Sequence, residues 1–479
     1  MPATSWSMLF HGRHAALTLL LNLSLSVSAT NVWIVATIMP SVVADLGGAE
    51  FYTWPTALYT VASILGTASG RFIRATLGLR RGYMAPVLVF LMGSVGCAVA
   101  PHMLVLLGTR TIQGGGAGVL SGLSFAIISA MYPEDLRPRL LSAFAGVWGV
   151  AALLGPLLGG VFAELGWWRG AFWVTMPLIL VVMGLIWRSL PDEAPERQAP
   201  HVPLLRLALL GLGVLCVAGT GHVAAPGMRL ALIGSAGVWV VLAFRCDARA
   251  AHRLFPSRPL ALTTPVGTGF WIEFLFYVTS SQVNGFLPLV VQILHGVSPL
   301  GAGYFSVLRP LAWTASALCT AGLQGRRVRL ATVLGPLVVT SGVVGQAAVV
   351  VQGPLFLLGG FGALTGIGYG LCYAHLNNWT MAAARPGEED RTASWIPMGA
   401  QLGTAFGAAI AGVVANAAGL AAGVSVVTVA AAATWVYGLS VAAPATIALL
   451  TLRVLWFHKP GWPPFGRESP KVANGTERE

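Results

Sequence analysis

Charged side chains are scarce in this sequence. Asp, Glu, Lys and Arg make up 9% of its 479 residues, whereas soluble domains usually carry about 25%. Hydrophobic residues make up 56%, and the mean hydropathy is +0.76. This composition excludes a soluble globular domain and predicts an all-α integral membrane protein.

Cysteine is also sparse. The five cysteines show no paired spacing that would mark a disulfide framework or a metal site. The sequence has no phosphate-cradling glycine loop and no nucleotide domain, so ATP-driven transport is not expected. We therefore expect neither a metal nor a cofactor.

Long apolar runs are abundant. A helix needs roughly 17 to 25 apolar residues to cross about 30 Å of hydrocarbon, and the sequence offers fourteen runs of this kind, of which 230–244 is the shortest. The predicted spans are 15–40, 51–70, 83–101, 103–131, 140–162, 171–188, 203–222, 230–244, 262–293, 299–323, 330–351, 354–382, 392–416 and 428–457.

The basic residues predict the orientation of these spans. Short cytoplasmic loops collect Lys and Arg, and nearly all of the 28 basic residues fall on one side if both termini are cytoplasmic. We place Arg169 and Arg229 outside and Arg110 and Arg309 within spans. The formal charge of +12 is explained by basic residues in the cytoplasmic loops, which set the topology. Contact of these loops with lipid headgroups is the alternative, and no nucleic-acid partner is expected.

One carboxylate lies among aromatic side chains in the stretch GFWIEFLFYVTSSQVNG, residues 269–285. Glu273 is the only acid well inside a predicted span, about 16 Å from its cytoplasmic end at 1.5 Å per residue. An ionised side chain near the midplane costs about 3 kcal/mol or more and usually marks an ion or substrate path. Tyr277, Ser280 and Asn284 follow on the same helical face. The alternative is a protonated Glu that joins two helices structurally.

Arg309, in SVLRPLAW, is a candidate partner for this acid because it also lies near the midplane, on the following span. A nearby Arg favours an ionised carboxylate, whereas apolar burial favours the protonated form. These opposed influences predict a carboxyl group that changes protonation with solvent access. Alternatively, Arg309 reaches an interface or pairs only with carbonyl groups.

Two further spans carry glycine-rich segments. In LLGTRTIQGGGAG, residues 106–118, Arg110 and Gln113 share a helical face at a spacing of three residues. In GVWGVAALLGPLLGG, residues 146–160, a proline interrupts the helix and predicts a kink. Plain helix packing is the alternative for either stripe. The small residues and the proline predicted to form a packing or gating seam are Gly149, Gly155, Pro156, Gly159 and Gly160.

These motifs resemble the major facilitator superfamily. RTIQGGGAG resembles the fourth-helix pattern R-x-x-Q-G-x-G-x-G, and GVAALLGPLLGG resembles the fifth-helix antiporter pattern G-x-x-x-G-P-x-x-G-G. WWRGAFWVTMPL (167–178) is similar to the entry of the sixth helix, with Thr175 where Asn is usual. FLPLVVQILHGVSPLGAG (286–303) resembles a span junction of the 14-span drug/proton antiporters.

The resemblance implies two six-helix halves, 15–189 and 262–457, with an extra helix pair at 203–244 and a disordered tail at 458–479. It also implies a monomeric, non-enzymatic, proton-coupled exporter in a bacterial inner membrane, with substrate, protons and lipid as its partners. In this family Arg110 would belong to the proton relay, and the fifth-helix motif would form the seam between halves that rock to alternate access.

Two positions depart from the family pattern. TNVWIVATIMP (30–40) places Asn31 where the family has Asp, and Asn cannot carry a proton. The loop GRFIRATLGLRRGY (70–83) keeps Arg80 and Arg81 of the usual latch but lacks its Asp. We therefore expect Glu273 to carry the coupled proton instead of the first half.

Aromatic side chains in the spans predict a cavity for hydrophobic or cationic compounds, with helix packing as the alternative for each. The other functions left open are an uncoupled facilitator, an exporter of a lipid or hydrophobic metabolite, and a membrane-embedded enzyme; for the last, the intramembrane His375 has no acid near it in sequence. The aromatic candidates are Trp33, Trp54, Phe270, Tyr277, Tyr304, Trp313, Tyr369 and Tyr373.

Overall fold

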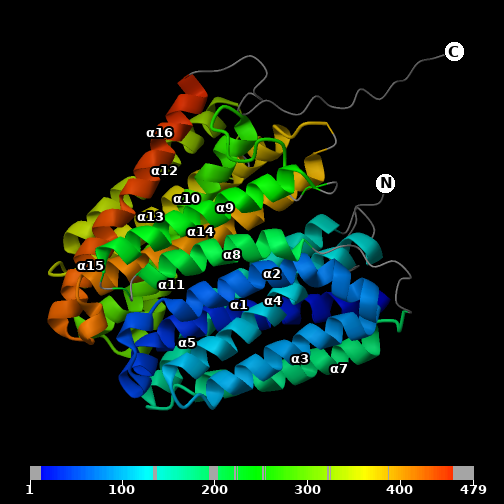
Figure 1. Ribbon diagram of the computed structural model, residues 1–479, viewed down its shortest axis with the longest axis horizontal. Coiled ribbons are helices and arrows are strands. Elements are labelled where there is room, and N and C mark those ends of the chain that lie inside the picture. Colours follow the sequence, from blue (N-terminus) through cyan, green and yellow to red (C-terminus); the bar gives the residue numbers. More distant parts are fainter. Residues whose placement is uncertain are drawn as a thin grey trace.

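The regular structure of the described residues is helical throughout (Figure 1). The computed structural model describes residues 12–132, 137–193, 203–220, 223, 225–250, 253, 255–320, 323, 325–386 and 388–456. The predicted tail at 458–479 lies outside this part of the chain. An all-α chain is confirmed for the residues described.

The first group of helices runs from residue 12 to residue 189. Its elements are α1 (Gly12–Leu46), η2 (Ala49–Phe51), α2 (Trp54–Leu77), α3 (Leu79–Ala98), α4 (Met103–Met131), α5 (Arg137–Glu164), α6 (Gly170–Trp173) and α7 (Met176–Ser189). Gly78 separates α2 from α3 at φ 77°, a left-handed conformation that disfavours any side chain. The predicted span 171–188 is interrupted between α6 and α7, where Pro177 follows Thr175, the residue that caps α7.

The remaining helices follow from residue 204. They are α8 (Leu204–Gly219), α9 (Pro226–Ala248), α10 (Pro265–Ile293), α11 (Pro299–Thr320), α12 (Arg326–Val349), α13 (Leu355–Ala382), α14 (Glu389–Ala417), η4 (Leu420–Ala422), α15 (Val426–Ser440) and α16 (Ala442–Trp456). Proline occupies the first position of α9, α10 and α11, where its missing N–H has no helical partner to lose. The short predicted span 230–244 is part of a 23-residue helix, α9.

Ten helical segments of the described residues are long and apolar enough to cross a membrane. They correspond to ten of the predicted spans, with α6–α7 and α15–α16 each counting as one crossing. The predicted spans at α2, α4, α8 and α11 are not among the ten. Each of these four helices nevertheless packs against one of them or against another predicted span. The arrangement of fourteen spans stays a prediction.

The helices form two groups with a pair between them (Figure 1). In the first group α4 packs on α2 and α3, and α1 packs on α5 and α7. In the second, α10 packs on α14, and α13 packs on α11 and α12. Helices α8 and α9 pack on each other, and α8 contacts both α2 and α14. The groups meet directly through α5 with α11 and α2 with α14.

Several contacts join the two groups at the end where α1 and α5 terminate, which the basic residues predict to be external and which we call the outer end. The backbone N–H of Leu300 donates to Glu164 Oε1 at 3.3 Å, and Asn416 Nδ2 donates to the carbonyl of Glu50 at 2.8 Å. A cavity of about 450 Å³ lies beside these contacts, between the ends of α1 and α10 and with Glu50 in its lining. The outer ends of the two groups are therefore in direct contact.

Candidate functional site

Glu273 lies in α10 and is almost fully buried, with 1% of its surface exposed. The hydroxyl of Tyr373, from α13, donates a hydrogen bond to its Oε1 at 2.9 Å. Gly399 of α14 lies against the same side chain, since a Cβ atom there would be 3.5 Å from Glu273 Cγ. The carboxyl group is therefore enclosed by α10, α13 and α14, and its hydrogen-bond partners are Tyr373 and Asn377, both from α13.

The tyrosine continues into an aromatic group. Tyr277, one turn along α10, lies 3.3 Å from Tyr373, hydroxyl to hydroxyl. Trp313 of α11 stacks on Tyr369, with ring centroids 5.0 Å apart, and meets the Tyr373 ring edge-on at 5.1 Å. The Tyr369 hydroxyl donates to the carbonyl of Phe276 at 2.7 Å. Aromatic residues from three helices thus surround the polar stripe of α10.

Arg309 contacts the other end of that stripe. Its Nη1 donates to Ser280 Oγ at 3.0 Å, and Asn284 Nδ2 donates to the same oxygen at 3.4 Å. Its guanidinium carbon lies 5.6 Å from the Tyr369 ring centroid, and its Nε has no hydrogen-bond partner. Among the described residues no ion pair within 4.0 Å joins Arg309 to Glu273. The two groups therefore contact hydroxyls of the same stripe rather than each other.

Arg110 lies in α4 of the first group and is 2% exposed. Its Nη1 donates to Asn31 Oδ1 at 2.5 Å and to Gln113 Oε1, and its guanidinium lies 4.2 Å from the Tyr59 ring. Gln113 Nε2 in turn donates to Ser94 Oγ at 2.8 Å. Arg110, Asn31 and Gln113 are therefore brought together as one polar site, in which Asn31 supplies a neutral acceptor.

The glycines of α5 face two different neighbours. A Cβ atom on Gly155 would lie 2.4 Å from Trp33 Cβ in α1, and Gly159 also faces α1. A Cβ on Gly160 would lie 2.5 Å from the Cα of Leu300 in α11. A Cβ on Gly303 of α11 would lie 2.8 Å from Pro156 Cβ, so Pro156 also lies at this contact.

Gly149 behaves differently from the other small residues of α5. Nothing lies within 4 Å of a Cβ atom built on it, so the space in that direction is open. The interpretation of Gly149 as a packing position receives no support from the structure.

The basic loop residues contact the segment that follows α7. Arg80 Nε donates to the carbonyl of Leu190 at 2.7 Å, and its guanidinium lies 5.5 Å from the Trp187 ring. Arg81 lies 3.9 Å from Asp192, with both side chains exposed. The loop therefore contacts the end of α7 although its own sequence lacks the usual Asp.

The other aromatic residues predicted to line a cavity lie in different surroundings. Trp33 packs beside Gly155, and Trp54 meets Phe51 edge-on, with centroids 5.8 Å apart. Tyr304 is 45% exposed. Phe270 stacks on Trp395 at 4.2 Å.

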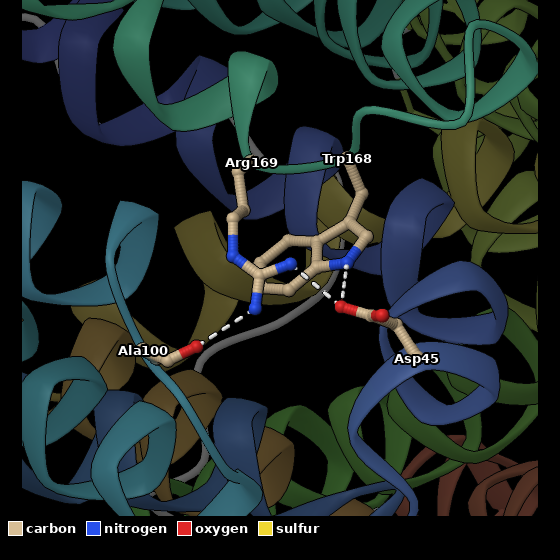
Figure 2. Close-up of polar contacts among 4 residues, drawn as sticks. All are labelled: Asp45, Ala100, Trp168 and Arg169. Carbon is tan, nitrogen blue, oxygen red and sulfur yellow. Dashed lines mark hydrogen bonds and ion pairs between the residues drawn. The ribbon is translucent and has the colours of Figure 1, made fainter.

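A cluster at the outer end was not found from the sequence (Figure 2). Asp45 Oδ2 accepts hydrogen bonds from Arg169 Nη1 at 2.6 Å and from Trp168 Nε1 at 3.1 Å, and Arg169 Nη2 donates to the carbonyl of Ala100 at 2.9 Å. The cluster ties α1, the end of α3 and the segment before α6 together. The WWRG motif was the available signal, but its partner acid lies 124 residues earlier.

Buried ionisable side chains within membrane-spanning helices usually mark an ion or substrate path. Two helix groups that meet at one end fit a transporter whose halves rock to alternate access. Residues 21–408 match the Major Facilitator Superfamily. The chain belongs to this family and is a multi-pass membrane transporter rather than an enzyme.

Similar proteins include multidrug transporters. A probable multidrug-efflux transporter of Mycobacterium tuberculosis is 31% identical over 430 residues, which cover 86% of this chain and 89% of the relative. Multidrug resistance protein 3 of Bacillus subtilis is 28% identical over 294 residues, covering 60% of this chain and 57% of that protein.

Solved structures share the fold. A POT peptide transporter in complex with sulfate has a TM-score of 0.66 at 14% identity, covering 93% of this chain and 96% of that one. The xylose transporter XylE from E. coli has a TM-score of 0.57 at 14% identity, covering 92% and 96%.

Proposed function

We propose that this chain is a proton-coupled antiporter that exports hydrophobic or cationic small molecules, and that Glu273 carries the coupled proton. The observation that carries the proposal is the buried carboxyl of Glu273 in contact with the hydroxyl of Tyr373. The membership of the family and the multidrug relatives support export of small molecules.

The environment of Glu273 suits both protonation states. Removing a carboxylate from water costs several kcal/mol, an expense that a protonated acid avoids. A hydroxyl donor stabilises the ionised form, because hydrogen bonds to charged groups contribute about 1.5–3 kcal/mol. The carboxyl can therefore hold a proton while enclosed and release it when water or a cation reaches it.

The first group of helices has no equivalent acid at the position where the family carries one. Asn31 contacts Arg110 through its amide oxygen and has no proton to exchange. Arg110, with Gln113, would position the site without titrating, since Arg stays charged. This leaves Glu273 as the proton carrier of the described membrane core.

Arg309 would act on Glu273 through charge attraction rather than through a direct contact. In the present structure it is held by Ser280, and Tyr277 lies between it and Glu273 along the stripe. An ionised Glu273 attracts both Arg309 and a cationic substrate, whereas the protonated acid attracts neither by charge. Substrate and proton would thus compete for one carboxyl group, which is the requirement for exchange.

The apolar and cation-binding surface next to this carboxyl would be supplied by four aromatic residues, Tyr277, Trp313, Tyr369 and Tyr373.

Rocking of the two groups would pivot on α5 and α11, where Gly160 and Gly303 allow close approach. The proposal includes fourteen spans with cytoplasmic termini, the halves 15–189 and 262–457 with the helix pair 203–244 between them, and a monomer in a bacterial inner membrane.

Glu273→Gln tests the proposal in proteoliposomes that contain a pH-sensitive dye. The variant should still export substrate down its own gradient but should lose substrate-linked proton movement, because Gln cannot exchange a proton. Asp192→Asn, which changes an exposed acid, is the matched control and should behave like the parent. Proton movement that persists in Glu273→Gln refutes the assignment. Substrate flux without proton movement in the parent would identify an uncoupled facilitator.

A further inference from the structure

Four aromatic side chains lie in contact, ring to ring, on the predicted cytoplasmic side of Glu273. Phe244 and Phe255 lie with ring centroids 4.8 Å apart, and Phe255 lies 4.6 Å from Trp395. Trp395 stacks on Phe270 at 4.2 Å with 15° between the ring planes. We call these four residues the aromatic cluster. They come from α9, the following connection, α14 and α10, so the cluster ties four parts of the chain together.

The aromatic cluster ends directly at Glu273. Phe270 precedes Glu273 by three residues on α10, so both lie on one helix face. A Cβ atom on Gly399 would lie 3.1 Å from the Phe270 ring and 3.5 Å from Glu273 Cγ. Beside them, Gly269 lies so close to Thr380 of α13 that a Cβ would be 2.1 Å from the Thr380 hydroxyl. Both faces of α10 are thus tightly packed just before the acid.

The connection between α9 and α10 holds the cluster in place, and we call residues 255–264 the strap. The backbone N–H of Phe255 donates to Asp247 Oδ2 at 3.1 Å, and Asp247 also pairs with Arg206 of α8. Ser257 donates to the Glu388 carboxylate before α14, with its N–H at 3.1 Å and with its hydroxyl. The strap therefore joins α8 and α9 to the start of α14.

A third contact fastens the strap to α10. Trp271 Nε1 donates to the carbonyl of Leu260 at 3.0 Å. Asp247 is 2% exposed and Phe255 is also 2% exposed, so these are interior contacts rather than loose surface ones. Any motion of α14 away from α10 would have to separate the Phe270–Trp395 stack and pull on the strap.

We propose that the aromatic cluster is the gate that controls water access to Glu273 from the cytoplasmic side, and that α8 and α9 act through the strap as its anchor. The gate is closed in this structure, because Trp395 and Phe270 are 1% and 4% exposed and Glu273, three residues after Phe270 on α10, is 1% exposed. This assigns a role to the helix pair that lies outside the two groups. The part of the inference that concerns proton release rests on the proposed function, whereas the part that concerns water access does not.

The groups that face Glu273 from its neighbouring helices are consistent with control by access. Tyr373 and Asn377 from α13 hydrogen-bond to it, Tyr277 shares its helix, and Gly399 is the contact from α14. The described ion pairs include no acid or base bound to Glu273. With no ionic partner to displace, the arrival of water becomes the event that permits its ionisation.

The test measures water access directly in the full-length protein. Inverted membrane vesicles, which expose the cytoplasmic face, are treated with a water-soluble carbodiimide, and modification of Glu273 is followed over time by mass spectrometry. We expect Trp395→Ala and Phe255→Ala to speed modification by about tenfold, because the closed gate loses the packing of a buried ring. Asp247→Ala should speed it by about fivefold, through loss of the buried hydrogen bond that holds the strap.

Two variants serve as controls. Phe172→Ala removes a ring of equal burial at the outer end and should leave the rate at the parental value. Trp395→Phe should restore a rate near the parental one, because a ring remains to stack on Phe270. If Trp395→Ala reduces the amount of protein in the membrane, Phe255→Ala and Asp247→Ala carry the test.

Parental modification rates in Trp395→Ala, Phe255→Ala and Asp247→Ala would overturn the gate. Faster modification in Phe172→Ala to the same extent would also overturn it, since the effect would then be general loosening. Failure of the proposed function is separately visible: if Glu273→Gln keeps proton coupling while the gate variants speed modification, the gate stands and Glu273 is not the proton carrier.

Discussion

Gly160 allows the two helix groups to close at the outer end, and adding one methyl group there should hinder that closure. In Gly160→Ala the new Cβ would lie 2.5 Å from the Cα of Leu300, whereas carbon atoms prefer about 3.5–4.0 Å. Helices α5 and α11 must therefore separate by about 1 Å. Overpacking of this kind costs about 1–3 kcal/mol, which corresponds to a shift of about 5- to 150-fold in the equilibrium between closed and open outer ends.

Gly149→Ala provides the matched control on the same helix. Both variants gain about 1 kcal/mol of helix propensity, but only Gly160→Ala meets a neighbouring backbone, since nothing lies within 4 Å of a Cβ on Gly149. The difference between the two variants therefore isolates the contact with Leu300.

The assay is the distance between spin labels at the outer ends of the two groups. Labels on cysteines that replace the exposed Trp167 and Val427, in a background without the five native cysteines, should show a longer-distance population that grows in Gly160→Ala and not in Gly149→Ala. Identical distance distributions in both variants would refute the reasoning, because they would mean that α5 and α11 adjust locally without moving the groups apart.

Two further predictions follow from single contacts. Tyr373→Phe removes the hydroxyl that donates to Glu273 and should slow proton-coupled export by about tenfold. The reason is that the ionised carboxylate loses a hydrogen bond of about 1.5–3 kcal/mol. Unchanged coupled flux would show that another donor is sufficient. Asp45→Ala removes the acceptor shared by Arg169 and Trp168 and should lower the free energy of unfolding by about 1 kcal/mol or less, because the pair is partly exposed. Thermal unfolding in detergent measures this loss, and transport by the folded protein should be preserved.

Most of the fold could be predicted from local sequence. Each predicted span overlaps a helix of the structure because membrane-embedded backbone must satisfy its hydrogen bonds internally. The helix period also placed Tyr277, Ser280 and Asn284 on the face of Glu273, and the structure connects this face through Tyr373 and Arg309. The pairing of Arg110 with Gln113 followed from their spacing in the same way.

The contacts between helices could not be predicted from the sequence. Glu273 contacts Tyr373, which lies 100 residues away, whereas Arg309 on the following span contacts Ser280. For Phe270 the sequence left a cavity position or helix packing open, and the structure stacks it on Trp395. Gly149 and Gly160 look alike in sequence, yet only Gly160 faces a neighbouring backbone.

The sequence by itself therefore determined which segments are helices and which side chains share a helical face, because both depend on hydrogen bonds and periodicity within one segment. Only the tertiary structure decided which faces meet, and so which residues are partners of Glu273. The physical reason is that lipid is as apolar as most of these side chains, so hydrophobicity does not select the buried face of a membrane helix. That choice depends on close packing and hydrogen bonds between segments far apart in the chain.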